Sequence, residues 1–262
     1  MLFPFSFMQS QYDPNAQAFF NRVTEAGGTL SDTEKTAVNT LVLDLKANSL
    51  WSSMKAIYPM VGGGTGTTAA RQAACEQNLV SASFTGTFTS GWTFTSSGAK
   101  PNGTSAYMDT NLIWNTNTSL NNGALGSYWT DYTATATNKY YGAYDASGVL
   151  LINHKDINGD NYINSFSAVN ANSGNGLHAL SRISSSEIVK YQNTSNTVGS
   201  STSTTQPIGL PVWFGGVSGL TNFGYQPWNI AMGFITDGFT NTTWSNFYTI
   251  VQAFQTTLSR QV

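Results

Sequence analysis

Apolar residues recur with two different periods along the chain, and the change in period divides it into two parts. Between residues 13 and 60 they recur every three or four positions, which is the repeat of an amphipathic helix. From about residue 81 they alternate with Thr and Ser and are interrupted by Gly and Asn, which is typical of short strands and turns. The pattern therefore predicts helices first and an antiparallel β-structure after them.

The first part carries recognisable helix starts. Asp13-Pro14 places a capping residue before a proline at the first helical position, and Ser31 with Glu34 is the signature of a capping box. A third short helix is expected over residues 50–58, ending before a proline. The glycine-rich stretch 62–66 lacks the Lys-Ser/Thr ending of a phosphate-binding loop, and we interpret residues 62–80 as a linker with room for a short helix or an extended segment.

The second part is neutral over a long distance. Residues 191–236 contain no charged side chain, and so neutral a β-prone stretch would aggregate unless it were held in a closed or two-layered sheet. The Asn/Ser/Thr-rich segment 193–205 is expected to be a long loop. Over residues 242–259 the helical repeat returns as one apolar stripe, so a terminal helix should pack on the sandwich or on the first helices.

These patterns predict an α+β fold that is mainly an antiparallel β jelly-roll sandwich of the concanavalin A or laminin-G type, with a small helical module before it. The predicted division of the chain is an apolar N-terminal segment (1–11), a helical module (12–61), a Gly/Thr-rich linker (62–80) and the sandwich with its terminal helix (81–262).

Charge excludes several functions. Only 9% of the residues are Asp, Glu, Lys or Arg and the formal net charge is −2, so a basic surface for nucleic acid is not expected. No apolar run approaches the roughly 20 residues that span a bilayer, so membrane insertion is not expected either. The single cysteine, Cys75, is interpreted as a small buried residue, since no catalytic signature surrounds it.

Catalytic chemistry has little support in the sequence. In the β-region no strand carries two acids two positions apart, which would aim a pair of carboxylates at one cleft. His154 and His178 are the only histidines, and no nucleophile elbow is present. We therefore expect a protein that is not an enzyme and assign no catalytic residue.

One loop has the ligand spacing of a calcium site. Asp156, Asn158 and Asp160 occupy the first, third and fifth positions of an EF-hand-like loop, but the sixth position is not Gly and the twelfth is not an acid. The alternative is a hairpin turn at Asn158-Gly159. Both interpretations remain open, and no other cofactor is expected.

Aromatic residues supply the candidate binding site. They make up 13% of the chain, and aromatic faces stack on sugar rings while Asn, Asp and Thr bond the hydroxyls. Trp129, Tyr140, Tyr141 and Trp228 are the predicted glycan-binding residues; the alternative for each is core filling. The apolar N-terminus, with Phe3, Phe5 and Phe7, is predicted to attach the protein to a partner.

Several segments resemble known proteins. They are Asp13–Phe19, Ala37–Val42, Asp44–Lys46, Leu50–Gly62, Ser90–Thr93, Gly98–Thr104, Tyr107–Thr110 and the ending Ser245–Val262. Together they resemble bacteriophage structural proteins in which a helical module precedes a laminin-G-like jelly roll; residues 115–235 match no motif of these proteins.

The resemblance implies a fibre, decoration or tail-associated protein on the virion surface. Its partners would be other virion proteins, reached through the N-terminal segment and the helical module, and host-surface glycans; multiple copies are expected. The alternatives are a polysaccharide depolymerase on the same sandwich and a ligand-free capsid cement protein.

Overall fold

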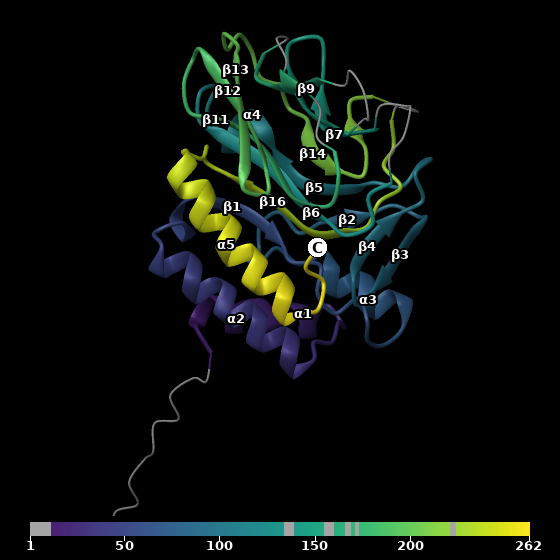
Figure 1. Ribbon diagram of the computed structural model, residues 1–262. Coiled ribbons are helices and arrows are strands. Elements are labelled where there is room, and N and C mark those ends of the chain that lie inside the picture. The colour runs from purple at the N-terminus through teal and green to yellow at the C-terminus, as the bar shows by residue number, and fades with distance from the viewer. Residues whose placement is uncertain (1–11, 134–138, 155–159, 166–168, 171–172, 221–223) are drawn as a thin grey trace, which may run out of the picture.

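The computed structural model describes residues 12–133, 139–154, 160–165, 169–170, 173–220 and 224–262. In this part of the chain three layers are stacked: a layer of helices, a central sheet and an outer sheet (Figure 1). The fold is therefore α+β with two sheets that are antiparallel apart from one parallel pair, β15 with β7, which is consistent with the predicted β-sandwich. The finer assignment to a jelly roll stays a prediction.

Five helices are formed by the described residues. They are α1 (Pro14–Glu25), α2 (Asp32–Ala47), α3 (Thr68–Cys75), α4 (Trp114–Asn117) and α5 (Asn241–Thr257), with a 3₁₀ turn, η1 (Trp51–Ser53), after α2. Both predicted caps are confirmed: the Asp13 side chain accepts from the Asn15 N–H, and Ser31 and Glu34 form a reciprocal capping box. The terminal helix is confirmed as well, one residue earlier than expected, with Thr240 as its cap.

The central sheet lies between the other two layers. Its strands, in spatial order, are β13 (Ser195–Ser200), β12 (Glu187–Gln192), β11 (Gly176–Arg182), β6 (Gly123–Trp129), β16 (Ile230–Thr236), β4 (Gly98–Pro101) and β3 (Trp92–Thr95), and β1 (Met54–Tyr58) also pairs with β16. Along β6, Ala124 and Tyr128 face the helices, whereas Leu125 and Trp129 face the outer sheet. Both faces of this sheet are therefore covered.

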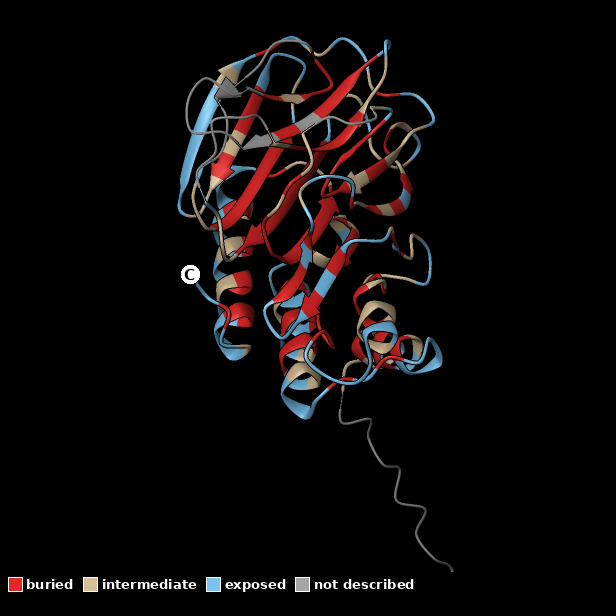
Figure 2. Cartoon of the chain, turned by 90° about the vertical axis from the view of Figure 1, so that its right-hand side faces the viewer, coloured by how far each residue is buried: buried red, intermediate tan, exposed pale blue. Residues whose placement is uncertain are grey.

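The outer sheet closes the sandwich. Its strands, in spatial order, are β10 (Val169–Asn170), β9 (Asp160–Ile163), β8 (Val149–His154), β7 (Lys139–Tyr144), β14 (Pro211–Phe214), β5 (Met108–Ile113) and β2 (Thr87–Phe88), with β15 (Val217–Ser218) beside β7. Strands β8 and β9 pair antiparallel, with Leu150 opposite Ile163, whereas the predicted turn at Asn158-Gly159 lies outside the described residues. Figure 2 shows that the buried residues concentrate in the strands and on the inner sides of the helices.

Two segments differ from the prediction. Residues 54–58, expected to be helical, form strand β1 and pair with β16, so the third predicted helix is wrong. Residues 195–200, expected to be a loop, form β13, which pairs with β12 from Ser195–Gln192 to Ser200–Glu187 without a register shift. In both segments pairing with a partner strand decides the conformation.

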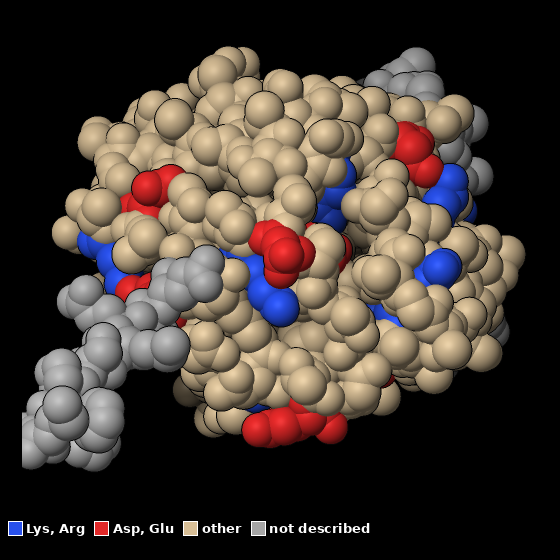
Figure 3. Space-filling view, turned by 90° about the horizontal axis from the view of Figure 1, so that it is seen from below, with Lys and Arg blue, Asp and Glu red and all other residues tan. Residues whose placement is uncertain are grey.

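The remaining observations bear on partners and on the thiol. No helix of the described residues has the length and hydropathy needed to cross a membrane. Lys, Arg, Asp and Glu side chains are scattered over the face seen from below, with no large basic patch on it (Figure 3). Cys75 is buried, as predicted, and burial raises the pKa of its thiol to about 12.

Candidate functional site

A polar cleft lies where the β3–β4 hairpin meets the beginning of β16 and the tail that follows α5. Its volume is about 410 Å³. It is lined by the tail residues 259–262 and by residues of the sheet and its loops, which include Thr95, Ser97, Lys100, Thr130, Asp131 and Asn229. We refer to it as the hairpin cleft.

Strand alternation aims the hairpin side chains. On β3, Trp92 and Phe94 are buried in the core between the sheets, so Thr93 and Thr95 point the other way and are exposed. Lys100 on β4 lies opposite Thr93 in the register. One face of this hairpin therefore presents hydroxyls and one ammonium to the cleft.

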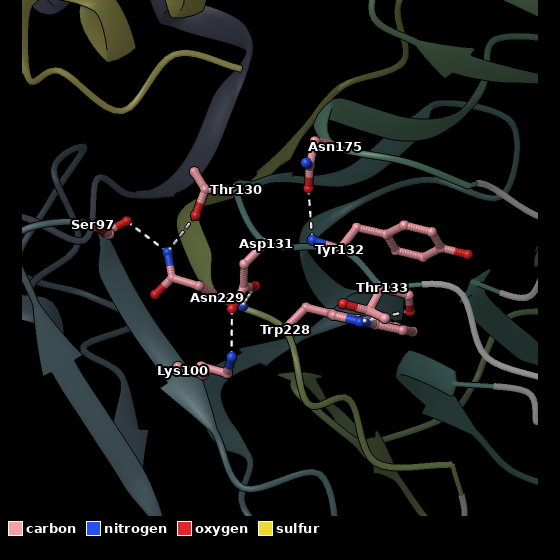
Figure 4. A network of polar contacts seen from close by, with 9 residues as sticks. All are labelled: Ser97, Lys100, Thr130, Asp131, Tyr132, Thr133, Asn175, Trp228 and Asn229. Atoms are coloured by element: carbon pink, nitrogen blue, oxygen red, sulfur yellow. Dashed lines mark hydrogen bonds and ion pairs between the residues drawn. The ribbon is translucent and has the colours of Figure 1, made fainter.

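Asp131, just after β6, carries the negative charge of the cleft. Its Oδ2 accepts from Lys100 Nζ at 2.5 Å and its Oδ1 accepts from the Asn229 backbone N–H at 2.5 Å (Figure 4). The Lys100 and Asp131 side chains are 49% and 36% exposed. An ion pair this open to water contributes little to stability. The same exposure makes both groups accessible to a polar ligand.

Asn229 is the most buried of the polar side chains in this group. It is 5% exposed, and its Nδ2 donates to the Ser97 carbonyl at 2.7 Å and to Thr130 Oγ1 at 2.8 Å. Its Oδ1 accepts no hydrogen bond from any of the described residues, and in Figure 4 no dashed line reaches it. An acceptor held this firmly, in a residue that lines a cleft, is available to a ligand donor.

The backbone around Asp131 is fixed from two sides. The Tyr132 N–H donates to Asn175 Oδ1 at 2.6 Å, and Trp228 Nε1 donates to the Thr133 carbonyl at 3.0 Å (Figure 4). These bonds tie residues 130–133 to the loop before β11 and to the segment before β16. The polar groups of the cleft are thus held in place before any ligand arrives.

The opposite wall is the chain after α5, and a buried arginine anchors it. The Arg260 guanidinium donates to the carbonyls of Pro59 and Met60 at 3.1 and 2.9 Å and to Gln255 Oε1 at 2.8 Å. Burial lowers the pKa of Arg260 to about 10, which still leaves it charged at neutral pH. The Val262 N–H donates to the Tyr128 hydroxyl at 2.9 Å.

The cleft offers an ammonium, a carboxylate, a free amide oxygen and several hydroxyls. This set of donors and acceptors matches a neutral ligand with many hydroxyl groups, because Lys100 and Asp131 neutralise each other and the Arg260 guanidinium is already bonded to protein oxygens. None of its lining side chains is aromatic, so binding would rest on hydrogen bonds. Asp131 is the only Asp or Glu among the described residues that line it.

The predicted glycan-binding residues do not lie in this cleft. Trp129 and Tyr141 are 0% exposed, Trp228 is 2% exposed and Tyr140 is 8% exposed. Trp129 stacks on Trp228 with the ring centroids 5.1 Å apart and lies 6.1 Å from the Tyr141 ring. Such buried rings offer no open face to a sugar; the alternative, that they fill the core, is what the structure shows.

The other predicted sites fall largely outside the described residues. Asp156 and Asn158 of the calcium loop lie outside them, and Asp160 is the first residue of β9. Phe3, Phe5 and Phe7 lie outside them as well. In the part of the chain that the structure describes, no three His, Cys, Asp or Glu side chains form a metal-binding group.

Sequence reasoning missed the residues that line the hairpin cleft. Lys100, Asp131 and Asn229 come from different parts of the chain; Lys100 lies in a segment of the resemblance, which assigns it no role, and Asp131 and Asn229 belong to no motif. In the sequence, Asp131 is distinguished only as one of the acidic residues of the β-region. The one useful signal was the alternation on β3, which placed Thr93 and Thr95 on the face opposite the aromatic core.

Comparison with known proteins identifies a fold likeness and no sequence relative. The sequence matches no protein family and no curated protein. Among solved structures, the chain is similar to a Trypanosoma rangeli sialidase in complex with sialic acid, with a TM-score of 0.54 and 8% identity over 82% of this chain and 39% of the sialidase. A mutant of that sialidase displaying trans-sialidase activity gives a TM-score of 0.44 at 8% identity over the same shares.

The likeness changes one expectation. The prediction that the protein is not an enzyme is contradicted, because the solved structure that shares its fold is a sialidase, which is an enzyme. This chain spans about two fifths of the length of that sialidase. At 8% identity the likeness shows the fold, and the fold that it shows is one used by a carbohydrate-active protein.

Proposed function

We propose that the protein is a structural component of a bacteriophage particle whose β-sandwich binds host-surface glycans in the hairpin cleft. The observation that carries the glycan part is the group formed by Lys100, Asp131 and Asn229. Its two charges are accessible, and the nearly buried Asn229 keeps an unused acceptor. The sialidase-like fold supports a ligand of the carbohydrate class.

The particle part rests on the segments that resemble bacteriophage structural proteins. Two of these segments, Asp13–Phe19 and Ala37–Val42, belong to the first half of α1 with its cap and to part of α2, and the ending 245–262 contains most of α5 and the tail. All three helices pack on one face of the central sheet. A virion-surface location, with many copies, would let weak single sites combine into firm attachment.

Removing the negative charge of the cleft tests the glycan site. We expect Asp131→Asn to weaken glycan binding about tenfold or more, because Lys100 loses its ion-pair partner and the hydroxyl groups of the glycan lose a charged acceptor. The measurement is binding to an array of bacterial surface glycans, followed by titration calorimetry with the strongest binder.

A second ion pair of the same kind gives the control. Lys55 and Asp237 lie 3.0 Å apart with similar exposure and do not line the cleft, so Asp237→Asn should leave glycan binding unchanged. Equal binding by wild type and Asp131→Asn would contradict the site. Absence of binding to every glycan on the array would contradict the function and favour a cement protein.

Glycan cleavage is a second candidate, favoured by the likeness to a sialidase. In such a reaction Asp131 would supply the one carboxyl group of the hairpin cleft. The second reacting group would have to come from the ligand or from a water molecule. Incubating the protein with the bound glycans and measuring new reducing ends or released sialic acid distinguishes the two: product formation that Asp131→Asn abolishes assigns the depolymerase.

Deleting residues 1–11 tests the attachment segment with Phe3, Phe5 and Phe7. We expect the shortened protein to be lost from assembled particles, measured by mass spectrometry of purified virions. It should still fold, because contacts that join α1 to α2 are made by residues outside the deletion: the Asp13 N–H donates to Asn39 Oδ1 and the Asp13 carboxylate pairs with Lys46. Incorporation at the wild-type level would contradict the proposed attachment.

A further inference from the structure

A second cavity borders the hairpin cleft. Its volume is about 290 Å³, and it lies between the β3–β4 turn, the beginning of α2 and the glycine-rich stretch 62–66. Both cavities are lined by Ser259, and consecutive residues of the turn divide between them: Thr95 and Ser97 face the cleft, Ser96 the second cavity. They are therefore two parts of one groove between the β3–β4 turn and the tail.

The glycines explain why the groove is open at this end. A Cβ on Gly63 would lie 2.4 Å from the Thr95 carbonyl oxygen, so only glycine allows the two backbones to approach this closely. Gly64, which lines the second cavity, would bring a Cβ to 3.2 Å from Ser96. The stretch thus builds a wall of bare backbone against the turn.

The carboxylate at this end is already occupied. Glu34 Oε2 accepts from the N–H and the hydroxyl of Ser31, and Glu34 Oε1 accepts from the Gly62 N–H at 2.6 Å. Glu34 therefore holds the glycine-rich stretch against α2, and both of its carboxylate oxygens are engaged by protein donors. Hydroxyls of Thr33, Thr65 and Ser96 remain along the wall.

We propose that this groove binds a neutral, N-acetylated oligosaccharide of several units, with one unit at Asn229 and the following units over the glycine-rich stretch. This rests on the proposed function and specifies its ligand. A neutral ligand is expected because Lys100 and Asp131 pair with each other, and because protein groups already hydrogen-bond Glu34 and Arg260, so that neither is available to pair with a charged ligand. An acetamide supplies an N–H donor for Asn229 Oδ1 and a methyl group that can lie against Val262, which lines the cleft.

Chain length is the measurable consequence. Chito-oligosaccharides of one to six units are titrated by calorimetry, with malto-oligosaccharides, which lack the acetamide, as the comparison series. We expect affinity to rise at least tenfold between two and five units, and the malto series to bind more weakly at every length. A larger contact made along one rigid groove gives this gain.

Filling the second cavity separates its contribution. Thr65 is exposed and lines that cavity, so Thr65→Trp should abolish the length-dependent gain and leave the affinity for two units unchanged. Thr68→Trp, also exposed but lining neither cavity, should keep the gain.

The outcomes separate the two claims. Equal affinity for two and five units, or an undiminished gain in Thr65→Trp, overturns the extended groove while the glycan function stands. Equal affinity for the chito and malto series overturns the acetamide assignment. Failure of every oligosaccharide to bind, together with an empty glycan array, overturns the proposed function itself.

Discussion

Arg182→Met should lower the free energy of unfolding by about 3–5 kcal/mol, because the guanidinium is a buried hub of hydrogen bonds. Its Nε donates to the Ile163 carbonyl at 3.1 Å, and its terminal nitrogens donate to the Ser201 carbonyl at 2.8 Å and to the Ser184 carbonyl at 3.2 Å. Methionine keeps much of the volume but donates nothing, so these carbonyls would lose their partner inside the protein.

The position of these acceptors explains the size of the effect. Ile163 ends β9 in the outer sheet, whereas Ser201 follows β13 at the edge of the central sheet. One side chain thus links the two sheets at their open end. Urea or guanidinium denaturation followed by tryptophan fluorescence measures the loss.

Arg71→Met is the matched control. Arg71 is partly exposed and donates to the Gly66 and Phe94 carbonyls at 3.1 and 3.4 Å. Because water can replace these bonds, we expect a loss below about 1 kcal/mol. Similar losses in the two variants would show that the buried hub has no special role.

Stability should fall steeply in mild acid because of His178. This residue is 0% exposed, and burial lowers the pKa of its imidazole to about 4; the nearby Lys190 charge lowers it further, while the Gly174 carbonyl opposes the shift. The folded protein therefore keeps His178 neutral in a range where the unfolded chain takes up a proton.

The direction follows from proton uptake. Above pH 6.5 neither state is protonated at His178 and its contribution is complete; between about pH 6.5 and 4 the unfolded state binds the extra proton, so stability decreases as the pH falls. At ~1.4 kcal/mol per pH unit, the total loss of unfolding free energy that His178 causes is about 3 kcal/mol.

Comparison with His178→Gln isolates this residue from the carboxylates, which also lose stability in acid. Free energies of unfolding are measured between pH 7 and 4.5 for both proteins. The wild type should lose about 2–3 kcal/mol more than the variant over this range. If the free energies of unfolding of the two proteins fell in parallel with pH, His178 would have the same pKa in the folded and the unfolded state.

Local signals in the sequence were sufficient for the helices α1, α2 and α5 and for the sandwich. The capping residues Asp13, Ser31 and Glu34 act within three residues of their partners, so their effect is readable without the fold. The stripe of α5 was equally readable, because the buried Trp244 and Phe247 sit at helical spacing and pack on the central sheet.

Segments whose conformation depends on strand pairing were not predicted. Residues 54–58 carry apolar residues at helical spacing, yet strand β16, far along the chain, pairs with them. Residues 195–200 have the composition of a loop, yet they form a hairpin with the preceding strand β12. Pairing overrides local preference in both, with a distant strand in the first segment and with a neighbouring strand in the second.

The candidate site was missed for a related physical reason. The abundance of aromatic residues was correctly seen, but composition does not tell which rings are buried. The central sheet is covered on both faces, so Tyr128 and Trp129, neighbours on β6, are buried on opposite sides. The polar residues Lys100, Asp131 and Asn229 meet only because the beginning of β16 lies between β4 and the end of β6, with Ile230 opposite both Ala99 and Trp129.

The pairing of β1 with β16 has a consequence for biosynthesis. Met54–Tyr58 leaves the ribosome long before its partner Ile230–Thr236 and the helix α5. The nascent chain must therefore carry an uncompleted layer, with apolar side chains uncovered, until these segments have been made. Contacts so distant in sequence make folding slow, and a cell producing this protein in quantity would depend on chaperones during that interval.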